Sequence, residues 1–201
     1  MGFFYFLLFH VFDLKTVIMK QIYPQKYAEY VNKYAEQYGV DPLLIFAMIK
    51  IESNFNADAK SSSEARGLMQ LMENTATETA KKIEEQEKNL QSQEVAVANH
   101  MQDENTEVSN HIEEGIQELY EPEKNIQLGT YYFSSLLTQY QNTGIALAAY
   151  NAGMGRVNEW IEKGTILPDG SNLEAIPFQE TNMYVRKVLN AYRIYQELYG
   201  S

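Results

Sequence analysis

The chain of 201 residues is 45% hydrophobic and 12% aromatic, which is enough apolar material for one folded domain and excludes a wholly disordered protein. The absence of cysteine excludes disulfide bonds, thiol nucleophiles and cysteine-ligated zinc. The formal charge is −11, most of it from residues 77–125, and no cluster of lysine and arginine could bind phosphates, so we expect no nucleic-acid partner.

The N-terminal segment is apolar but short. Residues 3–12 are apolar except for His10, and they amount to about half of the roughly 20 residues that span a membrane. Neither the basic start nor the small-residue cleavage site of a signal peptide is visible. Three interpretations stay open: a short or truncated export anchor, a membrane-surface helix and a helix packed on the domain. We expect residues 1–20 to be an anchor or signal-like segment, with membrane association through residues 3–19.

Apolar residues at helical spacing predict an all-α domain over residues 21–201, with six to eight helices and no alternating strand pattern. Asp41 is predicted to cap one helix, with Pro42 at its first position. Thr75 and Glu78 have capping-box spacing and predict the start of another. In chain order, the helices are expected at residues 24–39, 43–53, 75–83, 126–140, 145–150, 157–161 and 185–199.

Glu52 stands at the end of the apolar helix predicted over residues 43–53. It lies one helical turn beyond Met48 and Ile49, so the 3.6-residue period places its carboxyl on an apolar face. Burial disfavours the carboxylate anion and raises its pKa, and a raised pKa suits a general acid that works near neutral pH. The alternative is that the helix ends at Ser53 and Glu52 escapes into solvent. Position alone leaves both open.

Four short blocks of sequence follow one another along the chain. They are IESNFN, ARGLMQLM, AYNAG and IPFQET, at residues 51–56, 65–72, 149–153 and 176–181. Together they resemble the lytic transglycosylase domain of the soluble-transglycosylase type, a relative of goose-type lysozyme that cleaves bacterial peptidoglycan. The resemblance covers about residues 23–83 and 120–199. It implies a lysozyme-like all-α fold with a glycan-binding groove.

By this resemblance, Glu52 matches the single catalytic acid and base. The positions that match groove-lining or acid-supporting residues are Ser61, Gln70, Met72, Tyr150, Asn151, Glu180 and Tyr184. Amides, hydroxyls and a phenol suit the N-acetyl and hydroxyl groups of a glycan. Met72 could equally pack in the core, and Glu180 could equally cap the last helix.

The resemblance implies cleavage of the β-1,4 bond between N-acetylmuramic acid and N-acetylglucosamine, with formation of 1,6-anhydromuramic ends. Peptidoglycan strands would be the partner, no cofactor would be needed, and the site of action would be extracytoplasmic. The sequence identifies no protein partner. Two alternatives stay open: a hydrolytic muramidase, which needs a second carboxylate beside the bond, and a peptidoglycan-binding domain without turnover.

This chain departs from the family pattern at three places. Glu64 stands where the family commonly has glycine, and Glu73 stands where a proline usually follows the second methionine. Glu64 is either a solvated loop residue or the second carboxylate of a hydrolase. Residues 84–119 are an acidic insertion, expected to form one or two charged helices and to act either as a lid or as a solvated excursion. The spacing of its two histidines fits no helical metal pair, so we predict no metal.

Overall fold

The computed structural model describes residues 14–95 and 118–200. Within these residues the chain is helical from 14 to 22 and then forms seven α-helices, one 3-10 helix and two isolated β-bridges but no strand. The predicted all-α fold is therefore confirmed. In chain order the elements are α2 (Ala28–Tyr38), α3 (Pro42–Glu52), α4 (Glu73–Val95), α6 (Pro122–Tyr140), α7 (Thr143–Ala152), α8 (Met154–Glu162), η1 (Leu173–Ala175) and α9 (Gln179–Tyr199).

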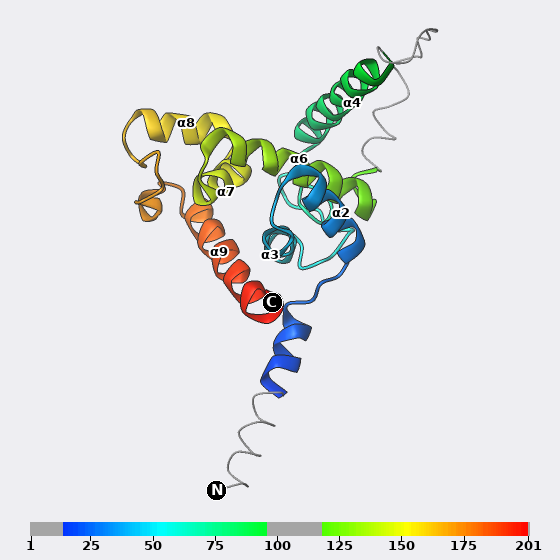
Figure 1. Cartoon of the computed structure of the whole chain (residues 1–201). Coiled ribbons are helices and arrows are strands. Elements are labelled where there is room, and N and C mark those ends of the chain that lie inside the picture. The colour runs from blue at the N-terminus through cyan, green and yellow to red at the C-terminus, as the bar shows by residue number, and fades with distance from the viewer. Residues whose placement is uncertain (1–13, 96–117, 201) are drawn as a thin grey trace, which may run out of the picture.

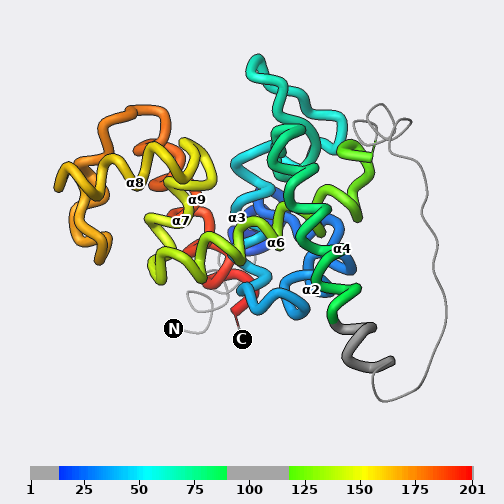
Figure 2. The backbone as a smooth tube through the Cα atoms, turned by 90° about the horizontal axis from the view of Figure 1, so that it is seen from above, coloured from blue at the N-terminus to red at the C-terminus, as the bar shows by residue number. Residues whose placement is uncertain are grey.

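The helices form two groups joined by α6. Figure 1 shows α7, α8 and α9 on one side of the molecule and α2, α3 and α4 on the other. Helix α6 runs between the groups and contacts α2, α4 and α7, and the view from above in Figure 2 shows the same order. Helix α9 crosses back and packs against α3, and this is the most extensive contact between two elements of the described structure. The last helix of the chain therefore lies against the helix that carries Glu52.

Helix α3 is the centre of the main core. The carboxylate of Asp41 accepts a hydrogen bond from the backbone N–H of Leu43 at 2.8 Å, and Pro42 occupies the first helical turn, so the predicted cap is confirmed. Every residue from Leu44 to Ile49 is buried, with at most 4% of its surface exposed. A helix that is apolar on all sides needs partners on all sides, and α2 and α9 supply them together with the loop after α3.

Several helix boundaries differ from the predicted ones. Helix α2 begins at Ala28 and not at Pro24, because Tyr27 has a left-handed backbone with a φ of 60° that interrupts any earlier helix. The capping box predicted at Thr75 is wrong, since the carbonyl of Met72 already accepts from the N–H of Ala76 at 2.9 Å. Helix α9 begins at Gln179, six residues before the predicted start.

Helix α4 continues to Val95, well past the predicted end at residue 83. The first part of the acidic insertion, residues 84–95, is thus helical as expected, while residues 96–117 lie outside the described part of the chain. In Figure 2 the described part of α4 runs along the flank formed by α2 and α6.

At the N-terminal side, residues 14–22 form a helix that leads away from the domain beside its C-terminus (Figure 1). Among residues 14–95 and 118–200, no helix combines the length and apolar character required to cross a bilayer. Residues 1–13, which hold most of the predicted apolar anchor, lie outside the described residues.

Candidate active site

Glu52 is the last residue of α3, and its carboxyl is desolvated by burial. The residue is half-buried, so the prediction that its carboxyl sits on an apolar face describes the structure better than escape into solvent. Burial raises the pKa of the carboxyl to about 7, and the hydroxyl of Tyr184 partly opposes that rise. At neutral pH the group therefore exists in comparable amounts as acid and as anion, which is the condition for exchanging protons in both directions.

Two buried phenols accompany this carboxyl. Burial in the first place, and then the charge of Glu52, raise the pKa of Tyr150 and of Tyr184 well above the ordinary value of tyrosine. The Tyr184 hydroxyl favours the anion of Glu52, although within the described residues it forms no hydrogen bond of ordinary geometry. A phenol with a free proton thus faces the carboxyl from α9, and a second phenol faces it from α7.

Tyr150 is fixed from several sides. Its hydroxyl donates to the carbonyl oxygen of Met69 at 2.8 Å. Its ring lies 5.4 Å from the ring of Tyr132 and 6.0 Å from that of Phe133, measured between centroids. Both rings belong to α6, so the long helix between the two groups holds the phenol in place.

The segment between α3 and α4 folds back on itself through several left-handed residues. Asn54, Phe55, Glu64, Gly67 and Gln70 all have φ between 48° and 76°. The turns bring the backbone of Arg66 and Leu71 together, where each N–H donates to the other carbonyl at 2.9 Å. This is how a short segment without regular structure acquires a fixed shape.

The predicted ligands Ser61 and Gln70 are engaged with their own loop. The Ser61 hydroxyl oxygen accepts from the N–H groups of Ser63 at 3.2 Å and Ala65 at 3.0 Å, which leaves its proton available as a donor. The Gln70 amide nitrogen donates to the carbonyls of Ala59 at 3.1 Å and Gly67 at 2.9 Å. Both hydrogens of that amide are used within the loop, which leaves its carbonyl oxygen as the group open to a ligand.

The other predicted ligands lie at the surface. Met72 is 45% exposed, so the alternative that it packs in the core is wrong. Asn151 follows Tyr150 on α7, and its side chain is exposed. Glu180 is exposed in the first turn of α9, where its charge also suits the helix dipole.

Asn125 is the functional residue that the sequence analysis missed. It is fully buried on α6. Its carbonyl accepts from the N–H of Met69 at 2.7 Å, and its amide donates to the carbonyls of Arg66 at 3.0 Å and Leu119 at 2.9 Å. A Cβ on Gly67 would stand 2.3 Å from the Asn125 amide nitrogen, so the glycine is needed for this contact. The sequence held one indication of this role: Asn125 is a polar residue directly before Ile126, where the apolar face of the predicted helix begins.

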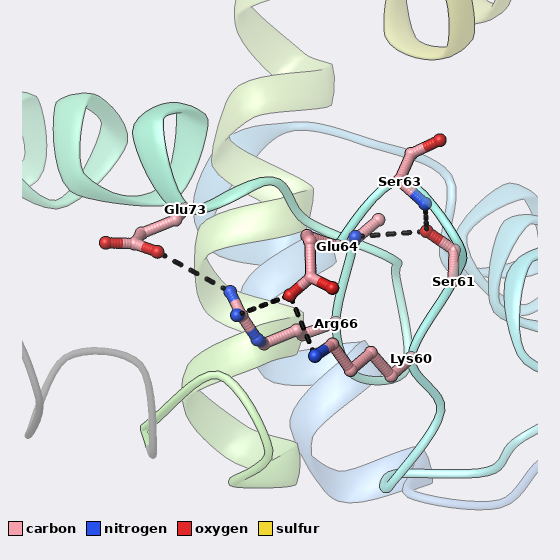
Figure 3. A network of polar contacts seen from close by, with 7 residues as sticks. Lys60, Ser61, Ser63, Glu64, Arg66 and Glu73 are labelled. Carbon is pink, nitrogen blue, oxygen red and sulfur yellow. Dashed lines mark hydrogen bonds and ion pairs between the residues drawn. The ribbon is translucent and has the colours of Figure 1, made fainter.

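Glu64, the candidate second carboxylate, is engaged with two cations (Figure 3). Its Oε2 lies 2.8 Å from Lys60 Nζ and 3.1 Å from Arg66 Nη2. The hydrogen bond from Lys60 holds the pKa of this carboxyl below its usual range. Among residues 14–95 and 118–200, no three histidine, aspartate or glutamate side chains come together to hold a metal ion. His100 and His111 lie outside that part of the chain.

Two segments of the chain, residues 29–100 and 96–169, match the family described as Transglycosylase SLT domain. The chain therefore belongs to the Transglycosylase SLT domain family, and the resemblance carried by the four sequence blocks is confirmed.

Particular relatives agree with this assignment. The chain is 31% identical to the soluble lytic murein transglycosylase of Salmonella typhimurium, over 90% of this chain and 25% of the relative. It is 32% identical to the membrane-bound lytic murein transglycosylase C of Edwardsiella ictaluri, over 86% of this chain and 47% of the relative. A solved structure of lytic transglycosylase Slt from Pseudomonas aeruginosa, an inactive glutamate-to-glutamine mutant, matches 87% of this chain and 24% of its own, with 34% identity and a TM-score of 0.66. The chain thus spans about a quarter of the length of the soluble relatives.

The raised pKa of Glu52 predicts a pH-dependent cost in stability. Because the folded state holds the proton up to about pH 7 and the unfolded chain only to about 4.5, stability falls as pH rises through that interval. We expect Glu52→Gln to match the unsubstituted protein at pH 4 and to exceed its free energy of unfolding by about 3 kcal/mol at pH 8. Urea denaturation at both pH values measures this. Glu78→Gln, on the exposed face of α4, should show no such dependence, and a pH-independent effect of Glu52→Gln would contradict the assignment.

Asn125→Ala removes the side chain that pairs with the buried N–H of Met69 and the carbonyl of Leu119, and it takes one of two donors from the carbonyl of Arg66. We expect it to lower the free energy of unfolding by about 3 kcal/mol, whereas Asn74→Ala, at an exposed position of α4, should change it by less than about 0.5 kcal/mol. Urea denaturation at 25 °C is the measurement. A loss for Asn125→Ala no larger than that of the control would mean that the loop holds its shape without this side chain.

Proposed function

We propose that residues 21–201 form one catalytic domain, a lytic transglycosylase that cleaves the β-1,4 bond between N-acetylmuramic acid and N-acetylglucosamine in peptidoglycan and leaves 1,6-anhydromuramic ends. One observation carries the proposal: a carboxyl with a pKa of about 7 stands beside two buried phenols, in a chain of this family. The inactive glutamate-to-glutamine mutant of the Pseudomonas aeruginosa relative supports a glutamate as the essential group.

In the first step, protonated Glu52 donates its proton to the oxygen that links the two sugars, and the bond to the muramic anomeric carbon breaks. The leaving sugar takes the proton, and positive charge develops on the anomeric carbon. Because burial keeps the carboxyl largely protonated below pH 7, the acid is available without an external proton source.

In the second step, the Glu52 anion takes the proton of the C6 hydroxyl of the same muramic acid, whose oxygen attacks the anomeric carbon and closes the anhydro ring. Glu52 ends the cycle protonated, so no water is consumed and no second carboxylate is required. The Tyr184 hydroxyl favours the anion and thereby stabilises the state between the two steps. Tyr150, held by Met69 and α6, is proposed to orient the carboxyl and the sugar ring.

Five further side chains are proposed to bind the glycan. Ser61 offers its hydroxyl proton and Gln70 its amide oxygen, because their remaining groups are used within the loop. Met72 offers an exposed apolar wall. Asn151 and Glu180 are proposed contacts from α7 and α9. Polar groups that are already held in place suit sugar recognition, since binding then costs little further ordering.

The proposed activity is tested by incubating the chain with purified peptidoglycan and identifying the released fragments by mass spectrometry. We expect anhydromuramyl ends from the unsubstituted protein and a loss of at least about a thousandfold in rate for Glu52→Gln, which cannot donate a proton. The rate of the first step should fall as pH rises through about 7, where Glu52 loses its proton.

Reducing muramic ends would identify a hydrolase instead. If the unsubstituted protein and Glu52→Gln both bind glycan and neither releases fragments, the chain is a binding domain.

We further propose that the domain acts outside the cytoplasm, where peptidoglycan lies, and that residues 3–19 associate with a membrane surface. Helical residues 14–22 expose Leu14, Val17, Ile18 and Ile22, each with 46–61% of its surface accessible. Lys15 and Lys20 are exposed on the same helix. An apolar stripe flanked by lysines suits the interface of an anionic bilayer. The membrane-bound relative gives the proposal a precedent by name.

Flotation with vesicles of phosphatidylethanolamine and phosphatidylglycerol tests this proposal. We expect the full chain to float, the chain without residues 3–19 to remain in the dense fraction, and Val17→Ser with Ile18→Ser to weaken binding about tenfold. Leu167→Ser, at an exposed leucine after α8, serves as the control and should leave flotation unchanged. Equal flotation with and without residues 3–19 would refute the membrane assignment.

A further inference from the structure

The two acids by which this chain departs from its family meet on one arginine. Glu64 Oε2 lies 3.1 Å from Arg66 Nη2, and Glu73 Oε2 lies 3.6 Å from Arg66 Nη1 (Figure 3). Lys60 Nζ completes the cluster at 2.8 Å from Glu64 Oε2. Two cations and two carboxylates thus form a network that is neutral as a whole. The ion pair between Arg66 and Glu73 joins residues seven positions apart in the chain.

Arg66 depends on these partners because it is buried. Its side chain is only 10% exposed, while the carboxylates of Glu64 and Glu73 are 57% and 43% exposed. Nη1 is buried and makes no hydrogen bond within the described residues. The ion pair with Glu73 therefore compensates for the removal of this nitrogen from water. A buried guanidinium without a counter-charge is strongly unfavourable, whereas either carboxylate alone would relieve part of that cost.

The network also acts on the backbone. Glu64 has a φ of 68°, a left-handed conformation that glycine adopts easily and a residue with a side chain does not. The Glu64 N–H donates to the Ser61 carbonyl at 3.1 Å, so the strained residue closes the same turn that the Ser61 hydroxyl holds. The pairing of the Glu64 side chain therefore compensates for a strain that glycine would not have.

We propose that Glu64 and Glu73 are coupled positioning residues which, through Arg66, hold the segment from Lys60 to Glu73 in the shape that presents its glycan contacts. The inference rests on the proposed function and adds to it. Because the Glu64 carboxylate is paired with Lys60 and Arg66, we assign it a positioning role and not that of the second carboxylate of a hydrolase. Glu64 and Glu73 are coupled because both pair with the same buried cation.

A double-mutant cycle on the full chain tests the coupling. We expect Glu64→Gln and Glu73→Gln each to lower the melting temperature by about 2–4 °C, since each leaves Arg66 with one partner. The double substitution should lower the melting temperature by more than the sum of the two single changes, since it leaves the buried charge of Arg66 without a carboxylate partner. Glu78→Gln on α4 is the matched control and should change the melting temperature by less than about 1 °C. The proposal is overturned if the two changes in melting temperature simply add and neither is larger than that of Glu78→Gln.

Kinetics on purified glycan strands separate positioning from catalysis. We expect Glu64→Gln to raise KM about fivefold with kcat within about twofold of the unsubstituted value. Glu64→Gly should recover at least half of that loss, because glycine removes the strain at this φ. A loss in kcat of more than about a hundredfold for both substitutions, at unchanged KM, would overturn the proposal and make Glu64 catalytic. If the unsubstituted chain releases no anhydromuramyl ends, the proposed function fails, and the melting-temperature cycle still decides the coupling.

Discussion

The burial of α3 on all its sides determines the rest of the domain. Six consecutive residues from Leu44 to Ile49 have almost no exposed surface, so the helix has no face to offer to water. Helices α2 and α9 and the returning loop are required to cover it. A carboxyl placed at the end of such a helix is desolvated as a consequence of the packing. The raised pKa of Glu52 is therefore a property of the core as much as of the site.

The phenol beside that carboxyl is fixed by a chain of contacts that starts far from it. Asn125 on α6 binds the N–H of Met69, and the carbonyl of Met69 accepts the hydroxyl of Tyr150. The peptide groups on either side of Met69 thus connect α6 to α7 through the loop. Each contact is buried or partly buried, so losing one leaves another polar group unsatisfied. The geometry around Glu52 follows from the cooperation of three elements that are separate in the sequence.

Much of this was predictable from the sequence, and the limits have physical causes. The apolar helix with its Asp41 cap and the all-α fold follow from capping chemistry and periodicity, which report on local geometry. Position in the sequence left the burial of Glu52 open, because it depends on the elements that pack around the end of the helix. The late start of α2, after Tyr27, was not predictable, because a left-handed tyrosine packed against the core has no sequence signal. The use of the Gln70 amide within its own loop was missed for the same reason. The role of Asn125 was not predicted because two of its three partners, Met69 and Arg66, lie 56 and 59 residues away in the chain.

The segment between Glu73 and Leu119, which contains the acidic insertion, leaves and rejoins the domain at almost the same place. Glu73, where α4 begins, pairs with the side chain of Arg66, and Leu119, just before α6, binds the Asn125 amide that also holds the Arg66 carbonyl. Both ends of the segment are therefore attached beside Arg66. A segment whose ends lie close together can gain or lose residues without separating the surrounding helices. A change in the length of the segment between Glu73 and Leu119 is therefore expected to leave the packing of α3 against α9 unchanged.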